Sequence, residues 1–368
     1  MTSEWRTIRA ADFIDFNPRL SLKKGDIATK VAMDKLKPFT KKIPETEKAE
    51  FNGGAKFCNG DTVMARITPC LENGKTAYVD MLDDGEIGFG STEFIVMRAK
   101  KGISDPQFVY YTAINPVFRN VAIKSMVGSS GRQRVQQSVL EELELSVPDL
   151  DEQRRIGDFL ARIDEKIALN DRINDNLQQQ AQAIYSSMFI DNPDPAWSHG
   201  HLSDLITVKY GKDHKKLADG IYPVYGSGGI MRYVERPLYN KESVLIPRKG
   251  TLNNVMYVNQ PFWSVDTMFY TEMKLPNVAK FVYHFVKAKD LASMNAGSAV
   301  PSMTTDILNA MEVVIPSASA LEEFESLVAP MYEAMEANDV QSKALSQMRD
   351  TLLPKIMSGE IDVSAVQL

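Results

Sequence analysis

Two segments of the chain place apolar residues at the spacing of a long amphipathic α-helix. In residues 149–190 the seam positions follow one another in steps of four and three, and the same steps recur in residues 317–357. A heptad seam of this length exceeds that of an ordinary globular helix, which indicates that each helix packs against a partner. The two seams are Ile156, Leu160, Ile163, Ile167, Asn170, Asn174, Leu177, Ala181, Ile184 and Met188, and Phe324, Val328, Met331, Met335, Asn338, Ser342, Leu345, Arg349, Leu352 and Ile356.

The chain also repeats itself outside these helices, with Pro148 and Pro316 standing 168 positions apart at the two helix starts. Before each helix stands a similar segment, FVYYTAINPVF and FVYHFVKAKDL, followed by a Gly-Ser loop, MVGSSGRQRV and MNAGSAVPSM. The order is the same in both halves, and a chance match would not preserve it. We interpret the chain as a tandem duplication of a globular block and a long helix.

The sequences of the globular blocks predict a mixture of strands and helices. Runs such as TVMARI, EFIVMRA, SVLIPR and MFYTEM are rich in residues that favour strands and are separated by Gly, Asn and Pro. One helix is expected in each block, around residues 105–125 and 277–294. The prediction is an α+β fold: two globular domains joined by two long antiparallel helices, a coiled coil with pseudo-two-fold internal symmetry. The predicted boundaries are 1–148 and 191–316 for the domains, 149–190 and 317–357 for the helices, and 358–368 for a tail.

Both seams turn polar near the middle of the helix, where Asn170 and Asn338 occupy equivalent positions. A seam asparagine lowers stability but fixes register, because a misregistered partner leaves its amide unpaired. If the helices pack antiparallel, their midpoints meet, and we expect Asn170 to face Asn338. The alternative is that both amides point to water. A helix of about 38 residues spans roughly 57 Å, so the pair would hold the two blocks apart as a ruler.

The composition limits the class of protein. No apolar run of the 368 residues approaches the ~20 needed to span a membrane. The start, MTSEWRTIRAADF, lacks the apolar core of a signal peptide. Cys58 and Cys70 are the only cysteines, which argues against a disulfide framework and against a cysteine-rich zinc site. We therefore expect a protein of the reducing cytoplasm.

The net charge of −6 argues weakly against nucleic acid, but the acidity is concentrated in the helices. Residues 149–190 carry −3 and residues 317–368 carry −6, whereas residues 1–148 and 191–316 carry +2 and +1. A nearly neutral block can still carry a basic face.

Motifs for catalysis are missing from the sequence. It has no GxxxxGK[ST] phosphate loop, no GxGxxG after a strand and no Asp/Asn-Pro-Pro-Tyr/Phe signature of an aminomethyltransferase. The stretch GSGGI is followed by Met-Arg-Tyr rather than by an obvious helix. His199 and His201 are interpreted as part of a surface loop before a strand rather than as metal ligands. We expect no catalytic and no metal-binding residues on this chain.

The segment VPDLDEQRRIGDFLARIDEKI, with its P-x-x-x-EQ-x-x-I opening, resembles the central conserved region of type I restriction-modification specificity subunits (HsdS). LLPKIMSGEIDV is similar to the end of that family's second conserved region, and GIYPVYGSGGI with VDTMFY to its target-recognition domains. The resemblance covers essentially the whole chain in the expected order. The second copy departs from it, because Ala320 and Leu321 replace the pair Glu152 and Gln153.

The resemblance implies two target-recognition domains, each reading half of a bipartite asymmetric sequence in double-stranded DNA. It also implies assembly with two modification subunits, which methylate adenine with S-adenosylmethionine, and with restriction subunits that use ATP. No cofactor is expected on this chain itself. The alternative is a non-catalytic coiled-coil scaffold whose duplicated blocks bind protein partners. A lone nuclease or methyltransferase is the third reading.

DNA contacts need donors and acceptors on loops, where Arg and Lys pair with guanine and Asn and Gln with adenine. The SSGRQR cluster meets this description best, with two cations beside an amide after a helix. The candidates in the first block are Arg66, Lys75, Ser129, Ser130, Arg132, Gln133 and Arg134. Those in the second block are Ser227, Arg232, Arg248, Lys249, Thr251, Asn253, Asn254, Ser298 and Ser302.

Overall fold

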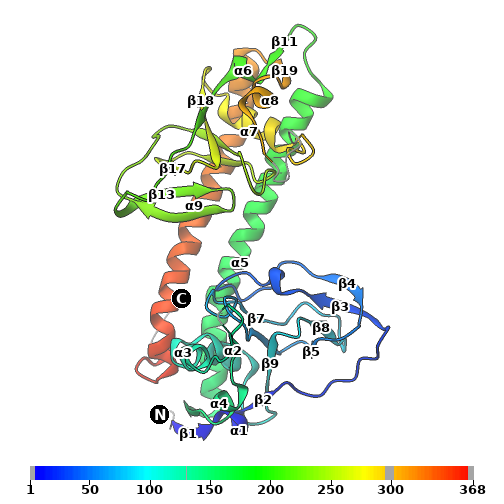
Figure 1. Ribbon diagram of the computed structural model, residues 1–368, viewed down its shortest axis with the longest axis vertical. Coiled ribbons are helices and arrows are strands. Elements are labelled where there is room, and N and C mark those ends of the chain that lie inside the picture. Colours follow the sequence, from blue (N-terminus) through cyan, green and yellow to red (C-terminus); the bar gives the residue numbers. More distant parts are fainter. Residues whose placement is uncertain (1–4, 130, 295–301, 364–368) are drawn as a thin grey trace. The chain divides into compact units, whose positions relative to one another are not determined.

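The computed structural model describes residues 5–129, 131–294 and 302–363 (Figure 1). It divides into two units: unit 1 comprises Met1–Arg172 with Asn338–Leu368, and unit 2 comprises Ile173–Ala337. The two long predicted helices are confirmed as α5 (Leu150–Ser186) and α9 (Ala318–Met357), and each contributes residues to both units. The finer division into domains, helices and tail stays a prediction.

Unit 1 contains two four-stranded sheets and one strand pair. The first sheet is antiparallel, in the order β2-β9-β6-β7, and in the second, β4-β3-β8-β5, strands β3 and β8 run parallel. The strands are β1 (Arg6–Arg9), β2 (Ile14–Phe16), β3 (Ile27–Val31), β4 (Glu47–Glu50), β5 (Ala55–Phe57), β6 (Thr62–Ala65), β7 (Thr76–Tyr78), β8 (Gly88–Gly90), β9 (Phe94–Ala99) and β10 (Glu144–Val147), of which β1 and β10 pair antiparallel.

The short helices of unit 1 are α1 (Ala10–Phe13), the 3-10 turn η1 (Met33–Lys35), α2 (Pro106–Ile114), α3 (Pro116–Lys124) and α4 (Gln137–Glu141). The single helix expected around residues 105–125 is therefore wrong, since α2 and α3 replace it. Asn115 stands between them in an extended conformation because it precedes Pro116, which disfavours a helical backbone at the residue before it. The Asn115 side chain accepts a hydrogen bond from the Val117 N–H and so caps α3.

Unit 2 repeats this topology. Its four-stranded antiparallel sheet has the order β12-β18-β15-β16, its three-stranded sheet β14-β13-β17 includes the parallel pair β13 and β17, and β11 pairs with β19. The strands are β11 (Ser198–His201), β12 (Ile206–Tyr210), β13 (Asp219–Gly226), β14 (Gly229–Val234), β15 (Ser243–Pro247), β16 (Met256–Val258), β17 (Trp263–Ser264), β18 (Met268–Met273) and β19 (Glu312–Ile315). The helices are α6 (Leu202–Leu205), α7 (Ala279–Lys287), α8 (Thr305–Asn309) and the π-helical turn η2 (Ser187–Asp191).

The antiparallel sheets of the two units have equivalent strand orders, and β14-β13-β17 of unit 2 corresponds to β4-β3-β8 of unit 1, which confirms the internal duplication. The four runs predicted as strands form β6, β9, β15 and β18, and the segment GSGGI forms the turn between β13 and β14. One expectation fails: His199 and His201 lie within strand β11 rather than in a loop before it, and both are exposed.

The helix seams complete the hydrophobic cores of the units. In unit 1 the seam residues Ile156, Leu160 and Ile163 are buried in one cluster with Phe108 and Tyr110 of α2. Full burial of one such aliphatic side chain contributes about 1.5–3 kcal/mol. In unit 2, Phe324 and Val328 of α9 lie in the core with α7 and with Tyr185 of α5.

Within each unit, the contacts between α5 and α9 show that the two helix segments run in opposite directions. In unit 1, Asp164 pairs with Arg349, and Asn170 contacts Asn338. In unit 2, the Asn174 side chain donates to the carbonyl of Met335 at 3.3 Å, and the Tyr185 ring packs against the Phe324 ring. Residue numbers rise on one helix as they fall on the other, so the helix segments in each unit are antiparallel.

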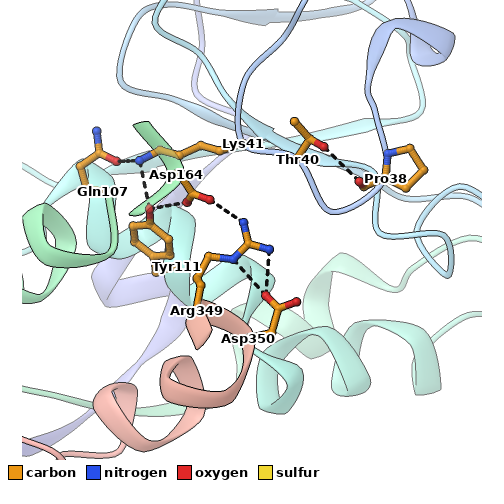
Figure 2. A network of polar contacts seen from close by, with 8 residues as sticks. All are labelled: Pro38, Thr40, Lys41, Gln107, Tyr111, Asp164, Arg349 and Asp350. Carbon is orange, nitrogen blue, oxygen red and sulfur yellow. Dashed lines mark hydrogen bonds and ion pairs between the residues drawn. The ribbon is translucent and has the colours of Figure 1, made fainter. Parts of the chain in front are cut away.

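A buried polar network joins α5 and α9 to the β-rich part of unit 1 (Figure 2). The Lys41 ammonium group donates to Gln107 Oε1 at 2.5 Å and to the Tyr111 hydroxyl at 3.2 Å. That hydroxyl donates to Asp164 Oδ2 at 2.6 Å, and the other oxygen of Asp164 pairs with Arg349. Burial lowers the pKa of Lys41 to about 8. The network satisfies charged groups that would otherwise lie unpaired inside the unit.

The Glu-Gln pair at the start of α5 has a structural role. Gln153 is fully buried, and its Oε1 accepts from the Asp105 N–H at 3.0 Å, while its Nε2 donates to the carbonyls of Ile103 (3.2 Å) and Pro148 (3.0 Å). Gln153 thus links α5 to the segment that immediately precedes α2. The equivalent Leu321 is 2% exposed and packs in the apolar core of unit 2, so the second copy replaces a polar clamp by hydrophobic packing.

Replacing Gln153 with leucine should lower the free energy of unfolding by about 1–3 kcal/mol, because three main-chain groups lose their hydrogen-bond partner. Urea unfolding followed by circular dichroism measures the change. The control Asp151→Ala, which alters an exposed side chain in the same helical turn, should leave the transition nearly unchanged. Equal stability of the Gln153 variant and the control would contradict the clamp.

Candidate nucleic-acid interface

In unit 1 the described residues of the SSGRQR segment, Ser129 and 131–134, lie on a short turn held at its base by two main-chain hydrogen bonds. Val127 and Arg134 exchange N–H···O bonds of 3.0 and 2.9 Å, and Arg134 also bridges to Ile67, two residues beyond β6. Gly128 has φ +135°, and a Cβ there would lie 3.0 Å from the Arg132 carbonyl oxygen. The turn therefore requires glycine at this position, and it is anchored to the antiparallel sheet.

The nominated residues on this turn differ in what their side chains do. The Arg132 side chain is exposed and makes no hydrogen bond or ion pair with any residue that the structure describes, while its main-chain N–H donates to the Ser129 carbonyl at 3.0 Å. Ser129 is exposed as well, and Gln133 is half-buried, with its carbonyl accepting from the Thr68 N–H at 3.0 Å. Ser130 lies outside the described residues. Arg132 is thus the cation on this turn with its donors available to a partner.

Two other candidates in unit 1 are engaged within the fold. Arg134 holds the Glu93 carboxylate through Nε (3.0 Å to each oxygen) and Nη2 (2.6 Å), and these hydrogen bonds are the main reason that the pKa of Glu93 is lowered. The Lys75 ammonium donates to the carbonyl of Met33 at 2.9 Å. Arg66 stands farther from Glu93, with 3.9 Å between its Nε and the nearer carboxylate oxygen.

In unit 2 the corresponding loops follow β15. The Arg248 and Lys249 N–H groups both donate to the Thr267 carbonyl, and Lys249 forms an isolated bridge with Ser302. The Lys249 side chain is exposed and has no polar partner in the described parts of the chain, and Thr251 is also exposed. Arg248 is partly used, because its guanidinium lies 5.3 Å from the Tyr210 ring centre and donates to the Asp266 carbonyl at 3.3 Å.

The remaining candidates of unit 2 support the loops. Arg232 donates to the Leu217 carbonyl at 3.0 Å and to Asp219 at 2.8 Å. Asn253 donates to Asp290 at 3.0 Å and accepts from the Ala292 N–H, whereas Asn254 donates at 2.8 Å to the carbonyl of half-buried Ser227. Ser298 lies outside the described residues, and Ser302 is half-buried.

The two available cations occupy related places in their units. In unit 1 the bridge between Ile67 and Arg134 ties the second residue after β6 to the Gly-Ser turn, and in unit 2 the bridge between Lys249 and Ser302 ties the second residue after β15 to the equivalent segment. Each unit therefore places an available cation near the C-terminal end of the equivalent strand, β6 in unit 1 and β15 in unit 2.

The helix-pair residues are also in contact. Asn170 is fully buried, and its Nδ2 lies 3.3 Å from the Asn338 carbonyl, 2.9 Å from Gln341 Oε1 and 3.1 Å from Ser342 Oγ. Asn170 thus meets the main chain of Asn338 and its neighbours, rather than pairing amide to amide. The role of this contact in fixing register stays a prediction.

Sequence reasoning missed a basic cavity in unit 1, lined by Arg19, Lys56 and Arg66. The only signal for Arg19 is the polar turn Asn17-Pro18-Arg19 after β2. Among the described residues no group of three or more His, Cys, Asp or Glu side chains is placed to hold a metal ion. In the same parts of the chain, no helix combines the length and apolarity needed to cross a membrane.

The family model described as the type I restriction modification DNA specificity domain matches residues 3–179 and 196–324. The chain belongs to this specificity family. The two matched segments correspond to the two halves of the duplication.

Relatives of known type support the same assignment to type I specificity subunits. The HindI specificity subunit of Haemophilus influenzae is 22% identical, over 82% of this chain and 86% of its own length. The MjaIX specificity subunit of Methanocaldococcus jannaschii is 24% identical, over 66% of each chain. The crystal structure of the S subunit of a type I system from M. genitalium aligns over 96% of each chain with a TM-score of 0.59 at 18% identity, and so shares the fold of this specificity-family member.

Proposed function

We propose that the chain is the non-catalytic DNA-recognition subunit of a type I restriction-modification complex. It reads a bipartite, asymmetric target in double-stranded DNA and positions two adenine-methylating modification subunits together with restriction subunits. S-Adenosylmethionine and ATP would be bound by those partners. The observation that carries the proposal is the pair of available loop cations, Arg132 and Lys249, at related places of two duplicated units within a member of the specificity family.

The difference between the two loops supports an asymmetric target. An arginine on the Gly-Ser turn stands in one unit, and a lysine on the loop after β15, two residues before a threonine, stands in the other. Both cations can bind guanine in the major groove, but their reach and geometry differ. Two copies of one fold with different side chains would therefore read two different half-sites.

The buried Asn170 supports a fixed spacing between half-sites. An antiparallel helix pair with one register has one length, and a slip by one helical turn would remove the three hydrogen bonds of this amide. We propose that the register of α5 and α9 sets the length of the unread spacer in the target.

The proposal is tested first in the host. Methylation-sensitive sequencing of host DNA with and without the gene should show loss of a gapped, adenine-methylated motif when the gene is deleted. An unchanged methylation pattern, with the modification subunits still produced, would contradict it. Binding that is insensitive to salt and directed to a protein would favour the scaffold reading instead.

Arg132→Ala and Lys249→Ala should each weaken binding of the methylated motif's duplex by about 10–100-fold, which corresponds to ~1–3 kcal/mol. Each variant should also relax base preference, Arg132→Ala in one half-site and Lys249→Ala in the other. Competition binding against duplexes randomised in one half-site measures both effects. Lys101→Ala removes an exposed cation in the turn after β9 and is the matched control. Unchanged affinity for both loop variants would remove these loops from the interface.

A further inference from the structure

Unit 1 contains an open cavity of about 590 Å³ bordered by elements of both of its sheets. The chain leaving β2, the start of β5, the residue after β6 and the beginning of β9 form its wall. The lining residues are Asn17, Pro18, Arg19, Leu20, Gly54, Ala55, Lys56, Arg66, Thr92, Phe94 and Val96.

The charge of the cavity indicates an anionic ligand. Arg19, Lys56 and Arg66 line it, and no carboxylate does. This concentration of positive charge occurs in a chain whose net charge is −6. Three cations on one concave wall, with Glu93 near Arg66 but held by Arg134, raise the local concentration of anions.

The donors of these cations are largely available. Arg19 is exposed and makes no hydrogen bond or ion pair within the described part of the chain. Arg66 Nε is buried without a hydrogen-bond partner there, the Arg66 side chain as a whole is 33% exposed, and the nearby Glu93 carboxylate is already held by Arg134 on both oxygens. Lys56 donates to the Leu20 carbonyl at 3.0 Å.

The wall is held together by main-chain contacts and includes apolar residues. Asn17 is tied to β9 by two hydrogen bonds, its N–H to the Val96 carbonyl at 2.7 Å and its Oδ1 from the Val96 N–H at 2.9 Å. Gly54 approaches β8 so closely that a Cβ would lie 2.0 Å from the Gly90 carbonyl oxygen. Buried Phe94 also lines the cavity. Basic and apolar residues in one lining fit a sugar–phosphate segment, whose anion and sugar need these two surfaces.

We propose that this cavity binds the phosphodiester backbone of DNA, with Arg19 and Arg66 contacting phosphate and Thr92 offering its hydroxyl at the rim. The inference rests on the proposed function. It divides the DNA-binding surface of unit 1 into two parts, one for the DNA backbone and one for the bases. Arg134 and Glu93 connect Arg66 to the turn that carries Arg132, so the cavity lies next to that turn. The cavity would fix the position of the duplex without reading sequence, and the turn would read base edges.

The test measures the dissociation constant of the full chain for a target duplex and for an unrelated duplex as salt is raised. Arg19→Gln loses no internal contact and should lower the slope of log affinity against log salt by about 1, and Arg19→Gln with Arg66→Gln by about 2. Affinity for both duplexes should fall by the same factor, about tenfold or more for the double variant. Arg66→Lys keeps the charge and should restore most of the slope. Lys101→Gln, beyond the opposite end of β9, should leave it unchanged.

The outcomes separate the inference from the function on which it rests. If the wild-type chain prefers no duplex, the proposed function fails. If the wild-type chain binds its target and the Arg19 and Arg66 variants keep its salt slope, the cavity proposal fails alone. A loss confined to the target duplex would make the cavity a base reader and also overturn it. Pyrophosphate binding at constant ionic strength, with the DNA salt slope unchanged in the variants, would assign the cavity to a free phosphate compound instead.

Discussion

Replacing Arg349 with leucine should lower the free energy of unfolding by about 3–5 kcal/mol. The side chains of Arg349 and Asp164 are each 5% exposed, and they form an ion pair between α9 and α5 within unit 1 (Figure 2). Without the guanidinium, the Asp164 carboxylate keeps only the Tyr111 hydroxyl as a partner among the described residues and lies in a site that water barely reaches. The large cost comes from this uncompensated charge, rather than from the attraction that is lost.

A second substitution distinguishes these two origins. Adding Asp164→Asn to Arg349→Leu removes the charge but keeps an oxygen that accepts from Tyr111, so the double variant should regain roughly half or more of the lost stability. The exposed pair Arg154 and Asp151 on α5 provides the control, and Arg154→Leu should change stability by less than about 1 kcal/mol. An Arg349 variant as stable as this control, in urea unfolding, would contradict a buried charge network.

Unit 2 should lose stability as the pH falls from 6.5 to 4 because His284 is held neutral. His284 is fully buried, with Nδ1 2.8 Å from Gln182 Oε1 and Nε2 2.9 Å from the Tyr332 hydroxyl. Burial lowers its pKa from 6.5 to about 4. Between these values the unfolded chain binds a proton that the folded chain excludes, so acid favours unfolding. The contribution is roughly 3 kcal/mol, fully present above pH 6.5 and lost by pH 4.

His284→Gln should remove this pH dependence, since glutamine stays neutral throughout. The difference in unfolding free energy between wild type and variant, measured at several pH values from 7 to 4.5, isolates the histidine from the carboxylates that titrate in both proteins. The rings of Tyr185, Tyr283 and Tyr332 surround His284 and do not titrate in this range, because burial raises the pKa of each. His199→Gln, in exposed β11, should behave as wild type. Parallel pH curves for the wild type and the His284 variant would contradict a neutral buried histidine.

The sequence predicts the helices and the duplication well because both depend on local spacing. Ile156, Leu160 and Ile163 are apolar at helical intervals, and these residues are buried in the structure. The break between α2 and α3 was predictable from Asn115-Pro116, but the apolar residues on both sides conceal it. The clamp made by Gln153 was not predictable, since its partners Asp105 and Ile103 come from a distant segment.

The candidate interface was predictable as loops, but not as individual contacts. The side chains of Arg132 and Lys249 remain available to a partner. Arg134 and Arg232 lie in similar polar loop sequences, but acidic residues that only the fold brings near form ion pairs with them. Glu93 and Arg134 are 41 residues apart in the sequence, and no local pattern predicts that they form an ion pair. The cavity around Arg19 has the same origin, because its wall gathers short pieces of several strands with no shared periodicity.

The division of the chain also has a consequence for its synthesis. Unit 2 is one continuous stretch, Ile173–Ala337, inserted into the sequence of unit 1. The core of unit 1 contains Leu353, Ile356 and Met357, which are synthesised after the whole of unit 2. The N-terminal part of unit 1 therefore stays incompletely packed while unit 2 is made. A stop codon between residues 338 and 353 would remove part of the core of unit 1 and leave the sequence of unit 2 intact.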